Sequence, residues 1–412
     1  MLTEVLQPTR EHVANMKEDE IIRAPSLWEL TRTFLHLGST AYGGLAMVEP
    51  IRRKVVQERS WLSQKDFLDG LALCQLLPGA TVVQLATYVG YRLRRTTGAL
   101  AAAGAFILPA FVLMCGLSAL YLEYGELTWV KAVSKGFNAV VIALLLQALW
   151  RFKEILRRHW LDPGIALLTL GALWGGANYL LVFLAAGFLR WALGLKWTPE
   201  AEGLGAVESQ ERLTKPGRSA TRALTAALAL ALGVWGLWHL DQRLGLMSLI
   251  FLKVGVLAFG GGYAMIPILQ WEMVDHLGWL SLRQFLDGIL LGFVTPGPII
   301  ITATFIGFWI KGLAGAFVGT VAIFLPPILM IIFLTPLYQR LKEGRGMRLA
   351  IQGILSALVG MLVLVTLQLG RASLVDLQSW AIMAGAAVAL IAFRINLAWV
   401  VVTVAGLSLI IF

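Results

Sequence analysis

Long stretches without any charged side chain constrain this chain more than any other feature of its sequence. No Asp, Glu, Lys or Arg occurs in residues 96–122, 163–189, 288–310, 312–339 or 349–370. A helix needs roughly 20 apolar residues to cross the hydrocarbon core of a bilayer. The whole chain is 58% hydrophobic and only 14% charged, unlike a soluble protein. The sequence therefore predicts an all-α, multi-pass membrane protein with roughly 10–14 membrane segments.

The remaining charges are unbalanced, with 34 Lys and Arg against 24 Asp and Glu. Basic residues at the ends of membrane spans set topology and explain this excess, so we expect no nucleic-acid partner. Residues 1–25 carry mixed charge without an apolar h-region, and we expect no cleavable signal peptide. Cys74 and Cys115 both lie in apolar runs and form no disulfide or metal motif. The lipid bilayer is therefore the partner that composition predicts.

Two copies of one sequence make up most of the chain. The segment from Phe34 to Gly44 resembles the segment from Phe251 to Gly261, and further shared motifs follow at nearly the same separation. Such self-similarity is the signature of a structural repeat. The shared motifs include Trp61-Leu-Ser and Trp279-Leu-Ser, Phe67-Leu-Asp-Gly and Phe285-Leu-Asp-Gly, and Ala86-Thr-Tyr-Val-Gly and Ala303-Thr-Phe-Ile-Gly. We predict a polar N-terminal segment (1–25), a first membrane repeat (26–193), a charged linker (194–222) and a second membrane repeat (223–412).

Positive charge is distributed differently in the two copies. In the first copy basic residues gather on segments expected on one face, while residues 123–135 on the opposite face hold only Lys131 and Lys135. In the second copy this bias is reversed. Because basic loops stay cytoplasmic, and because we expect an odd number of segments per copy, the copies are predicted to form an inverted repeat. On the basic face of the first copy these residues are Arg52, Arg53, Lys54, Arg59, Lys65, Arg92, Arg94, Arg95, Arg151, Lys153, Arg157 and Arg158. On the opposite face of the second copy they are Arg340, Lys342, Arg345 and Arg348.

Two charge-free segments, residues 70–91 and 288–310, are interrupted near their middles by Pro78-Gly79 and by Pro296-Gly297-Pro298. Proline removes a backbone donor and clashes with the preceding turn, while glycine tolerates unusual dihedral angles. We predict two broken helical hairpins or discontinuous helices. Within a membrane such backbone survives only where protein or a water-filled cavity surrounds it. Paired breaks in inverted repeats therefore indicate a transport site near the midplane.

The geometry of these breaks also predicts the sign of the ligand. A half-helix that starts after each break, near Thr81 and Ile299, presents backbone N–H groups and a positive dipole end, which attract anions. The alternative is that the Thr and Gln side chains only bond helices together or bond back to carbonyls. The predicted anion-binding residues are Gln75, Pro78, Gly79, Thr81, Gln84 and Arg92 in the first copy and Thr295, Pro296, Gly297, Pro298 and Thr302 in the second.

Carboxylates beside the spans are candidates for proton coupling. Asp69 and Asp287 occupy identical places in both hairpins, and intramembrane carboxylates are costly and therefore usually functional. The alternative is a solvated carboxylate that favours a helix N-terminus. Glu49 and Glu272, which follow the Gly-Gly motifs, are further candidates. Neither HExxH nor GxSxG occurs, and no His/Cys cluster is present, so we expect neither an enzyme nor a cofactor nor a metal site.

The motif string F-x-x-x-G, GG, WL-S, F-L-D-G, PG, A-T-x-x-G and LP, present twice, resembles the chromate ion transporter (CHR) family, in particular its long two-domain members. The likeness covers roughly residues 30–150 and 248–365. It implies a secondary carrier, an antiporter of the inner membrane, that exports chromate from the cytoplasm using the proton-motive force and confers chromate resistance, with sulfate as analogue or competitor. The second copy departs from the pattern at Phe308-Trp-Ile-Lys311, which has no arginine matching Arg92. It also has Pro296-Gly-Pro298 where the first copy has Pro78-Gly-Ala80, so the two sites are not expected to be equivalent.

Other functions stay open at this point. The substrate could be sulfate or another oxyanion, because chromate and sulfate are tetrahedral dianions of similar size. A passive anion channel would instead need a continuous pore and no coupled titratable group. An integral-membrane enzyme would need a convergent His, Asp or Ser site that the sequence does not present. The sequence also leaves open a homodimer.

Overall fold

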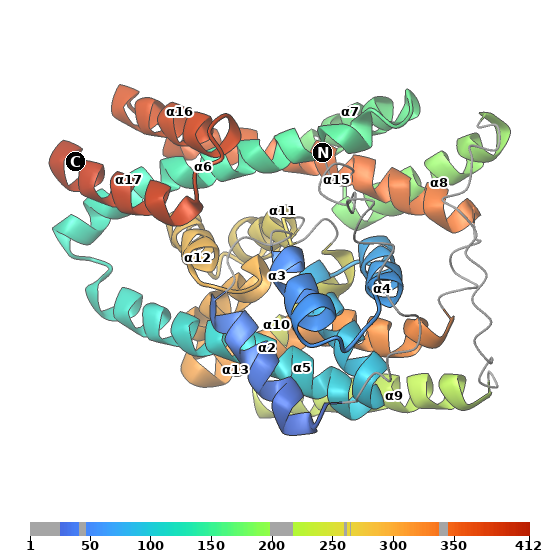
Figure 1. The fold of residues 1–412 in the computed structure, drawn as a ribbon. Coiled ribbons are helices and arrows are strands. Elements are labelled where there is room, and N and C mark those ends of the chain that lie inside the picture. The colour runs from blue at the N-terminus through green and yellow to red at the C-terminus, as the bar shows by residue number, and fades with distance from the viewer. Residues whose placement is uncertain (1–24, 41–46, 198–216, 259–261, 264, 338–344) are drawn as a thin grey trace, which may run out of the picture.

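The structure is a computed structural model that describes residues 25–40, 47–197, 217–258, 262–263, 265–337 and 345–412 (Figure 1). Every regular element among these residues is a helix. Four of the helices are long and apolar enough to cross a membrane, α5 (Thr81–Tyr124), α6 (Thr128–Leu156), α13 (Thr302–Leu334) and α15 (Arg345–Ser373), and shorter apolar helices accompany them. The predicted all-α, multi-pass membrane protein is confirmed.

The duplication is visible in most elements of the fold. The first copy begins with α2 (Leu27–Thr40), and its counterpart is α10 (Gln242–Leu257), which α9 (Gly217–Leu240) precedes. Both copies even contain a short π-helix at the same place, η2 (Arg53–Glu58) and η3 (Trp271–His276). The other elements are α3 (Val48–Arg52), α4 (Gln64–Leu76), α7 (Leu161–Trp174) and α8 (Tyr179–Trp197), then α11 (Met265–Gln270), α12 (Leu282–Val294), η4 (Ile299–Ile301), η5 (Thr335–Leu337), α16 (Leu377–Ile391) and α17 (Leu397–Ile411).

Helix α5 is folded back on itself. Its backbone leaves the helical region at Arg94 and Arg95, where φ is −140° and +53°. A Cβ on Gly90 would lie 2.2 Å from the carbonyl oxygen of Gly98, so only glycine permits the two arms to approach this closely. A short arm (residues 81–93) is therefore followed by a long arm (96–124). Helix α13 turns in the same way at Lys311 and Gly312, which gives it a short arm (302–310) and a long arm (313–334).

Helix α4 and the short arm of α5 form the first broken hairpin. The Tyr88 hydroxyl donates to the Asp66 carbonyl at 3.1 Å, and the Tyr88 ring lies against Gly70. The 13 residues of α4 span only about 20 Å, less than the roughly 30 Å hydrocarbon core, so the hairpin turns inside the protein at Pro78-Gly79. Helix α12, η4 and the short arm of α13 form the second hairpin in the same way, with Gly288 against Phe305.

The two hairpins point toward each other from opposite ends of the long arm of α5. The base of the first hairpin, where Arg92 and Asp66 form an ion pair, adjoins the start of this arm. Near the far end of the arm, the Tyr121 hydroxyl donates to Asp287 of α12 at 2.5 Å, and its ring meets Phe305 edge-on. Asp287 and Phe305 belong to the second hairpin. This is the geometry of the predicted inverted repeat.

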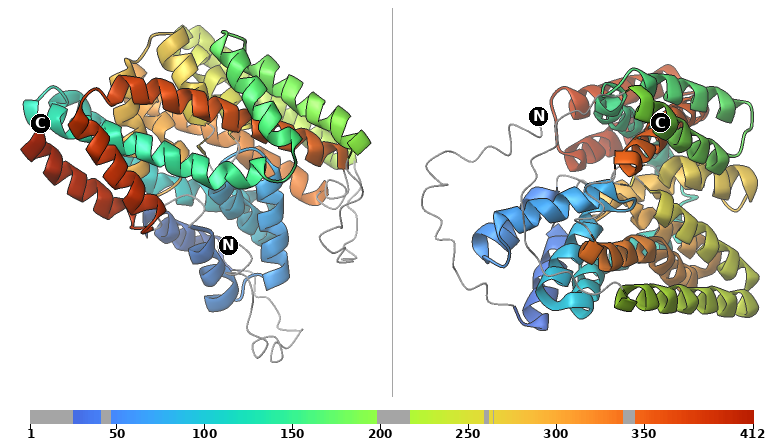
Figure 2. Two further views of the ribbon diagram at one scale, coloured as in Figure 1. Left: turned by 90° about the horizontal axis from the view of Figure 1, so that it is seen from above. Right: turned by 90° about the vertical axis from the view of Figure 1, so that its right-hand side faces the viewer.

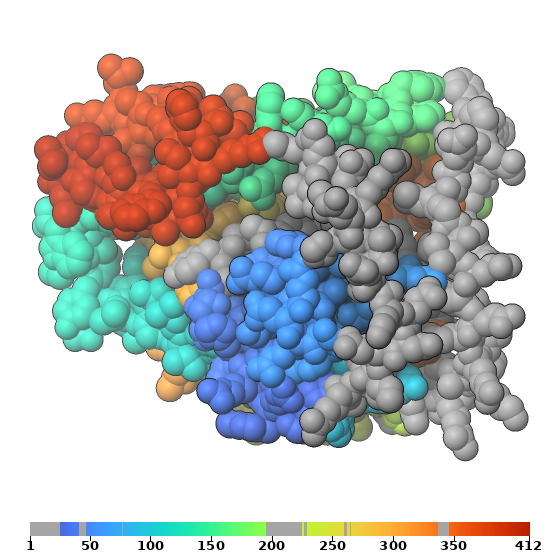
Figure 3. Space-filling model, in the orientation of Figure 1, coloured from blue at the N-terminus to red at the C-terminus, as the bar shows by residue number. Residues whose placement is uncertain are grey.

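The helices form two layers. Figures 1 and 2 show α6, α7, α8, α15, α16 and α17 on one side and α2, α3, α4, α5, α9, α10 and α13 on the other. Figure 3 shows α16 and α17 as an outer surface at the end where α5 passes into α6. This surface exposes large apolar side chains such as Leu377, Trp399 and Ile410. Apolar exposure of this kind suits contact with lipid.

The charge-free run 163–189 does not form one continuous helix. This run is divided into α7 and α8, because the chain turns at residues 175–178 and Gly176 adopts φ +82°. Asn178 then accepts from the Leu180 N–H at 2.9 Å and caps the new helix. Helix α8 continues to Trp197 and α9 begins at Gly217, so helix reaches into both ends of the expected linker. The polar N-terminal segment lies almost entirely outside the described residues.

Candidate functional site

The first hairpin tip, residues 77–80, is held between two elements of the second copy. Gly79 has φ +132°, which favours glycine, and its N–H donates to the Ala258 carbonyl at the end of α10, at 2.8 Å. A Cβ on Gly79 would lie 2.4 Å from the Cβ of Pro327 in the long arm of α13. The predicted residues Pro78 and Gly79 thus lie at a tip that is locked against the opposite repeat.

Helix α5 begins at this tip without a capping side chain. Its N-cap residue is Ala80, which offers no acceptor, and Thr81 to Gly90 are all buried. The first N–H groups of a helix have no partner within it and carry the positive end of the dipole. Gln84 is fully buried beside them. Its Nε2 donates to the Pro78 carbonyl at 2.7 Å, and its Oε1 has no partner among the described residues.

The second hairpin tip has the same backbone but different side chains. Gly297 adopts φ +120°, and a Cβ there would lie 2.8 Å from the Cβ of Ala110 in the long arm of α5. The Thr295 hydroxyl donates to the Leu291 carbonyl at 2.7 Å, and the Thr302 hydroxyl donates to the Ile299 carbonyl at 3.0 Å. Both hydroxyls are therefore used by the backbone, as the alternative interpretation of these polar side chains expects.

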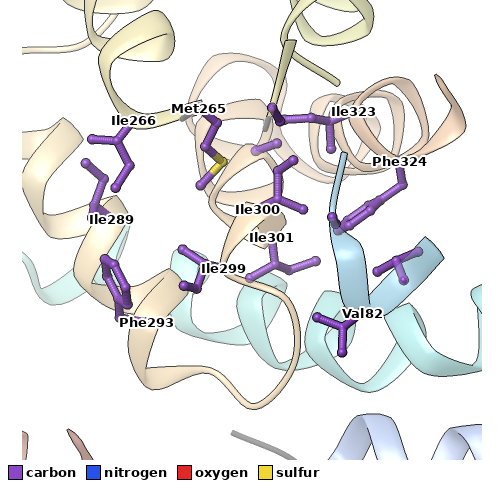
Figure 4. Packing of buried hydrophobic residues seen from close by; sticks show 14 of the residues in the cluster. Val82, Met265, Ile266, Ile289, Phe293, Ile299, Ile300, Ile301, Ile323 and Phe324 are labelled. Carbon is purple, nitrogen blue, oxygen red and sulfur yellow. The ribbon is translucent and has the colours of Figure 1, made fainter. Parts of the chain in front are cut away.

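An apolar wall covers the helix start at the second tip. Pro296 and Pro298 are buried, and η4 consists of three buried isoleucines. Figure 4 shows these isoleucines among Met265, Ile266 and Phe293. The second tip therefore offers few polar groups to an ion, and the two tips differ in chemistry.

Two of the predicted anion-binding residues lie away from both tips. Gln75 is exposed on α4. Arg92 lies at the base of the first hairpin, about 16 Å along the helix from Thr81, and its guanidinium pairs with Asp66 at 2.8 Å. The structure therefore places Arg92 in an ion pair at the hairpin base and not at the tip.

The four carboxylate candidates occupy different environments. Glu49 is half-exposed and forms two hydrogen bonds with Arg52, at 2.6 and 2.7 Å. Asp69 is half-buried on α4 and interacts with other groups. Asp287 and Glu272 are each only 3% exposed. A buried carboxylate is costly unless it is paired or protonated, so these two are the stronger candidates for proton coupling.

Asp287 is surrounded by groups from three helices. It accepts from Tyr121 of α5 and lies 3.8 Å from Arg283 of its own helix, and Ser134 of α6 lies nearby. Its second oxygen, Oδ1, has no partner among the described residues. An acceptor left empty in this way is expensive for an ionised carboxylate. The site is thus suited to hold a proton.

Comparison with known proteins decides the family. A profile described as chromate transporter matches residues 28–191 and 246–410. The chain belongs to the chromate transporter family. It is 32% identical over 364 residues to a probable chromate transport protein of Synechococcus elongatus. That alignment covers 87% of this chain and 88% of the relative. It is 31% identical over 357 residues to a chromate transport protein of Cupriavidus metallidurans, with 86% and 85% covered. No solved structure matches the chain.

For this member of the chromate transporter family, the two matched ranges coincide with α2–α8 and α10–α17, so both hairpins lie inside them. An archaeal relative, a transporter of Methanocaldococcus jannaschii described as uncharacterized, is 32% identical over 367 residues and covers 87% of each chain. Membership of a transporter family and the apolar helices together make the chain a multi-pass membrane transporter. The resemblance identified from the repeated motifs is confirmed.

Sequence reasoning gave little weight to one group of residues in this transporter. The Lys253 ammonium donates to Glu272 Oε1, and the Tyr179 hydroxyl donates to the same oxygen at 2.7 Å. Lys253 is the one charged residue between positions 244 and 271, which was a usable signal because lone intramembrane charges are rare. Tyr179 gave no such signal, because it joins the pair from a helix of the other copy.

Proposed function

We propose that this chain is a secondary active transporter that exports chromate from the cytoplasm across the cell membrane, driven by the proton-motive force. Its relatives in Synechococcus elongatus and Cupriavidus metallidurans carry chromate transport in their names. The observation that carries the proposal is the pair of opposed hairpins, whose tips contact the long arms at Pro327 and Ala110. Opposed broken helices in inverted repeats are the usual setting of a transport site.

The anion is proposed to bind at the first tip rather than the second. A dianion in a low-dielectric interior needs several donors, since an unpaired charge there is prohibitive. The uncapped, buried N-terminus of α5 supplies backbone N–H groups and a positive dipole end, and Thr81 and Gln84 lie beside it. Sulfate has the same shape and charge as chromate and is expected to compete.

The orientation follows from the charges at the two ends of the molecule. Arg92, Arg94 and Arg95 lie at the base of the first hairpin, which we assign to the cytoplasm because basic residues favour that side. At the opposite end, Lys131 pairs with Glu126 and Lys135 pairs with Asp376, each at 2.6 Å. Residues 123–135 at that end contain only these two basic residues, fewer than the first hairpin base and its flanks.

Flux measurements test the proposal directly. Everted membrane vesicles that contain the protein should accumulate radiolabelled chromate when a proton-motive force is imposed, and excess sulfate should reduce this uptake. Uptake that is unchanged when the gradient is abolished would contradict a coupled carrier and favour a passive channel. The isoleucines that close the second tip support the carrier, because a channel needs a continuous polar path.

A further inference from the structure

An ion pair with a buried carboxylate connects the second copy with the last helix of the first copy. Lys253 lies on α10, and its ammonium is hydrogen-bonded to Glu272 of η3. The Tyr179 hydroxyl of α8 donates to the same carboxylate at 2.7 Å, and the Tyr179 ring lies 5.4 Å from the ammonium. Three elements therefore converge on one carboxylate that is only 3% exposed.

The first copy serves as an internal control for the role of this pair. His36 stands where the second copy has Lys253, and it is exposed. Lys54 stands where the second copy has Glu272, and it pairs with Glu58 of its own helix at 2.7 Å. The first copy therefore builds the same helices without a buried pair.

Packing beside the pair is also the same in both copies. Gly38 of α2 lies against the Phe106 backbone, and Gly255 of α10 lies against the Ile323 backbone in the equivalent way. The close helix contact thus does not depend on Lys253. A buried ion pair is in any case weak evidence for stability, since apolar residues of similar volume pack at least as well. The fold does not explain why the second copy keeps two charges here.

Lys253 lies on the helix whose end contacts the first tip. Five residues after it, the Ala258 carbonyl holds the Gly79 N–H of that tip. The Lys253 side chain is 36% exposed and lines a groove of about 910 Å³ between α9 and α10, in which it and His239 are the ionisable residues among mostly apolar ones such as Trp238 and Pro326. Pro326 precedes Pro327, which contacts Gly79. The ammonium therefore has open space on one side, and its helix ends at the first tip.

We propose that Lys253 is an oxyanion-binding residue of the transport path and that Glu272 is its exchangeable counterion. When Glu272 is ionised, it holds the ammonium. When Glu272 takes up a proton, it becomes neutral and keeps the Tyr179 hydrogen bond, while the ammonium accepts the oxyanion as its new partner. The inference rests on the proposed function and adds to it a residue and a rule, namely that the proton and the anion bind together.

Other titratable groups lie around the pair. His276 of η3 has its Nδ1 3.9 Å from Glu272 Oε2, and Tyr179 approaches from α8. His239 of α9 lines the same groove as Lys253, and Asp275 of η3 accepts from Gln270. Glu272 is the only one of these groups in direct contact with the ammonium in the part of the chain that the structure describes. One proton carried with each dianion leaves one net negative charge, so the membrane potential, which is the electrical part of the proton-motive force, would drive export while the pH gradient would oppose it.

Binding to the purified full-length protein tests this rule. Sulfate is the better probe, because chromate itself takes up a proton near neutral pH and sulfate does not. Wild-type protein should bind sulfate more tightly as the pH falls and should take up protons from a weakly buffered solution on binding. Glu272→Gln should bind with little pH dependence and without proton uptake. Lys253→Met should weaken binding about tenfold or more, as expected for a lost charged hydrogen bond.

Matched variants keep the result interpretable. Lys253→Arg preserves the charge and should retain binding, and the double variant Lys253→Met with Glu272→Gln removes both charges and should fold while binding as weakly as Lys253→Met. Wild-type affinity and proton uptake in both single variants would overturn this inference and leave the proposed function standing. Wild-type protein that binds neither sulfate nor chromate would overturn the proposed function itself.

Discussion

The two hairpin tips have nearly the same backbone and very different surroundings. Each tip has a glycine in the left-handed region that packs against the long arm of the other copy, Gly79 on Pro327 and Gly297 on Ala110. The residues that start the next helix differ, with Thr81 and Gln84 at the first tip and the η4 isoleucines at the second. Duplication therefore kept the turn, which packing requires, and left the chemistry of the tips free to diverge.

This comparison shows that the Pro-Gly motif by itself indicates a tight turn that packs against the other copy, and does not by itself indicate a binding site. At the second tip, the Thr295 and Thr302 hydroxyls donate to backbone carbonyls. At the first tip, Gln84 Oε1 has no hydrogen-bond partner among the described residues. An unsatisfied buried acceptor costs stability, and such a cost is usually tolerated at functional sites. Asymmetry between the copies thus points to the first tip as the site of binding.

The largest expected effect comes from the two tip glycines. Gly79→Ala and Gly297→Ala should each lose about 1–3 kcal/mol of stability from the unfavourable φ alone, with more at Gly79 because its Cβ would approach Pro327 more closely. Thermal unfolding of the purified variants measures this. If the first tip binds the anion, chromate flux per folded molecule should collapse in Gly79→Ala and fall less in Gly297→Ala. Equal losses of flux would argue against the asymmetry.

A smaller effect is expected from the polar side chains at the tips. Gln84→Leu should raise the KM for chromate about tenfold, because the amide that holds the Pro78 carbonyl is lost beside the helix start. Thr302→Val is the matched change at the second tip and should cost about 1 kcal/mol of stability with an unchanged KM. Flux measured over a range of chromate concentrations separates the two. A raised KM in Thr302→Val alone would reverse our assignment of the site.

The base of the first hairpin is expected to contribute less. Arg92 and Asp66 are both partly exposed, so a double-mutant cycle on Arg92→Ala and Asp66→Ala should give a coupling energy of about 0.2–1 kcal/mol. Arg92→Ala should also slow chromate flux by a few-fold at low ionic strength, because exposed charges act through steering. A flux that is insensitive both to salt and to this substitution would remove Arg92 from the path.

The smallest effect is expected at Asp376, which caps the N-terminus of α16 and whose contribution to stability depends on pH. In the connection before α16, the Lys135 ammonium and the Ser379 N–H lower the pKa of Asp376 to about 2. A depressed carboxyl pKa adds stability that is present above the ordinary value of 3.8 and is lost as the pH falls toward about 2. The Asp376→Asn variant should therefore differ from wild type by less than about 1 kcal/mol at neutral pH and converge with it in that acid range. A constant difference down to the acid limit would contradict this.

The features that could be predicted from the sequence are those that depend on residues close together in the chain. Charge-free length, Pro-Gly breaks and the shared motifs act within a few residues, and they correctly predicted the membrane helices, the duplication and the two hairpins. The bias of positive charge predicted the inversion. The division at residues 175–178 was visible in the sequence as a Gly-Gly-Ala-Asn run, although the apolar length of the segment was also compatible with one span. Asn178 can cap α8 only after the chain has turned at this run.

The sequence by itself determined the membrane class, the repeat and the places where the helices break, because these depend on backbone conformation and on transfer of side chains into lipid. Only the tertiary structure decided which polar groups are already paired. Arg92 pairs with Asp66, Thr302 bonds its own turn, and Tyr179 meets Glu272 across 93 residues. Such pairings follow from how helices distant in the chain pack together, and no local pattern records them.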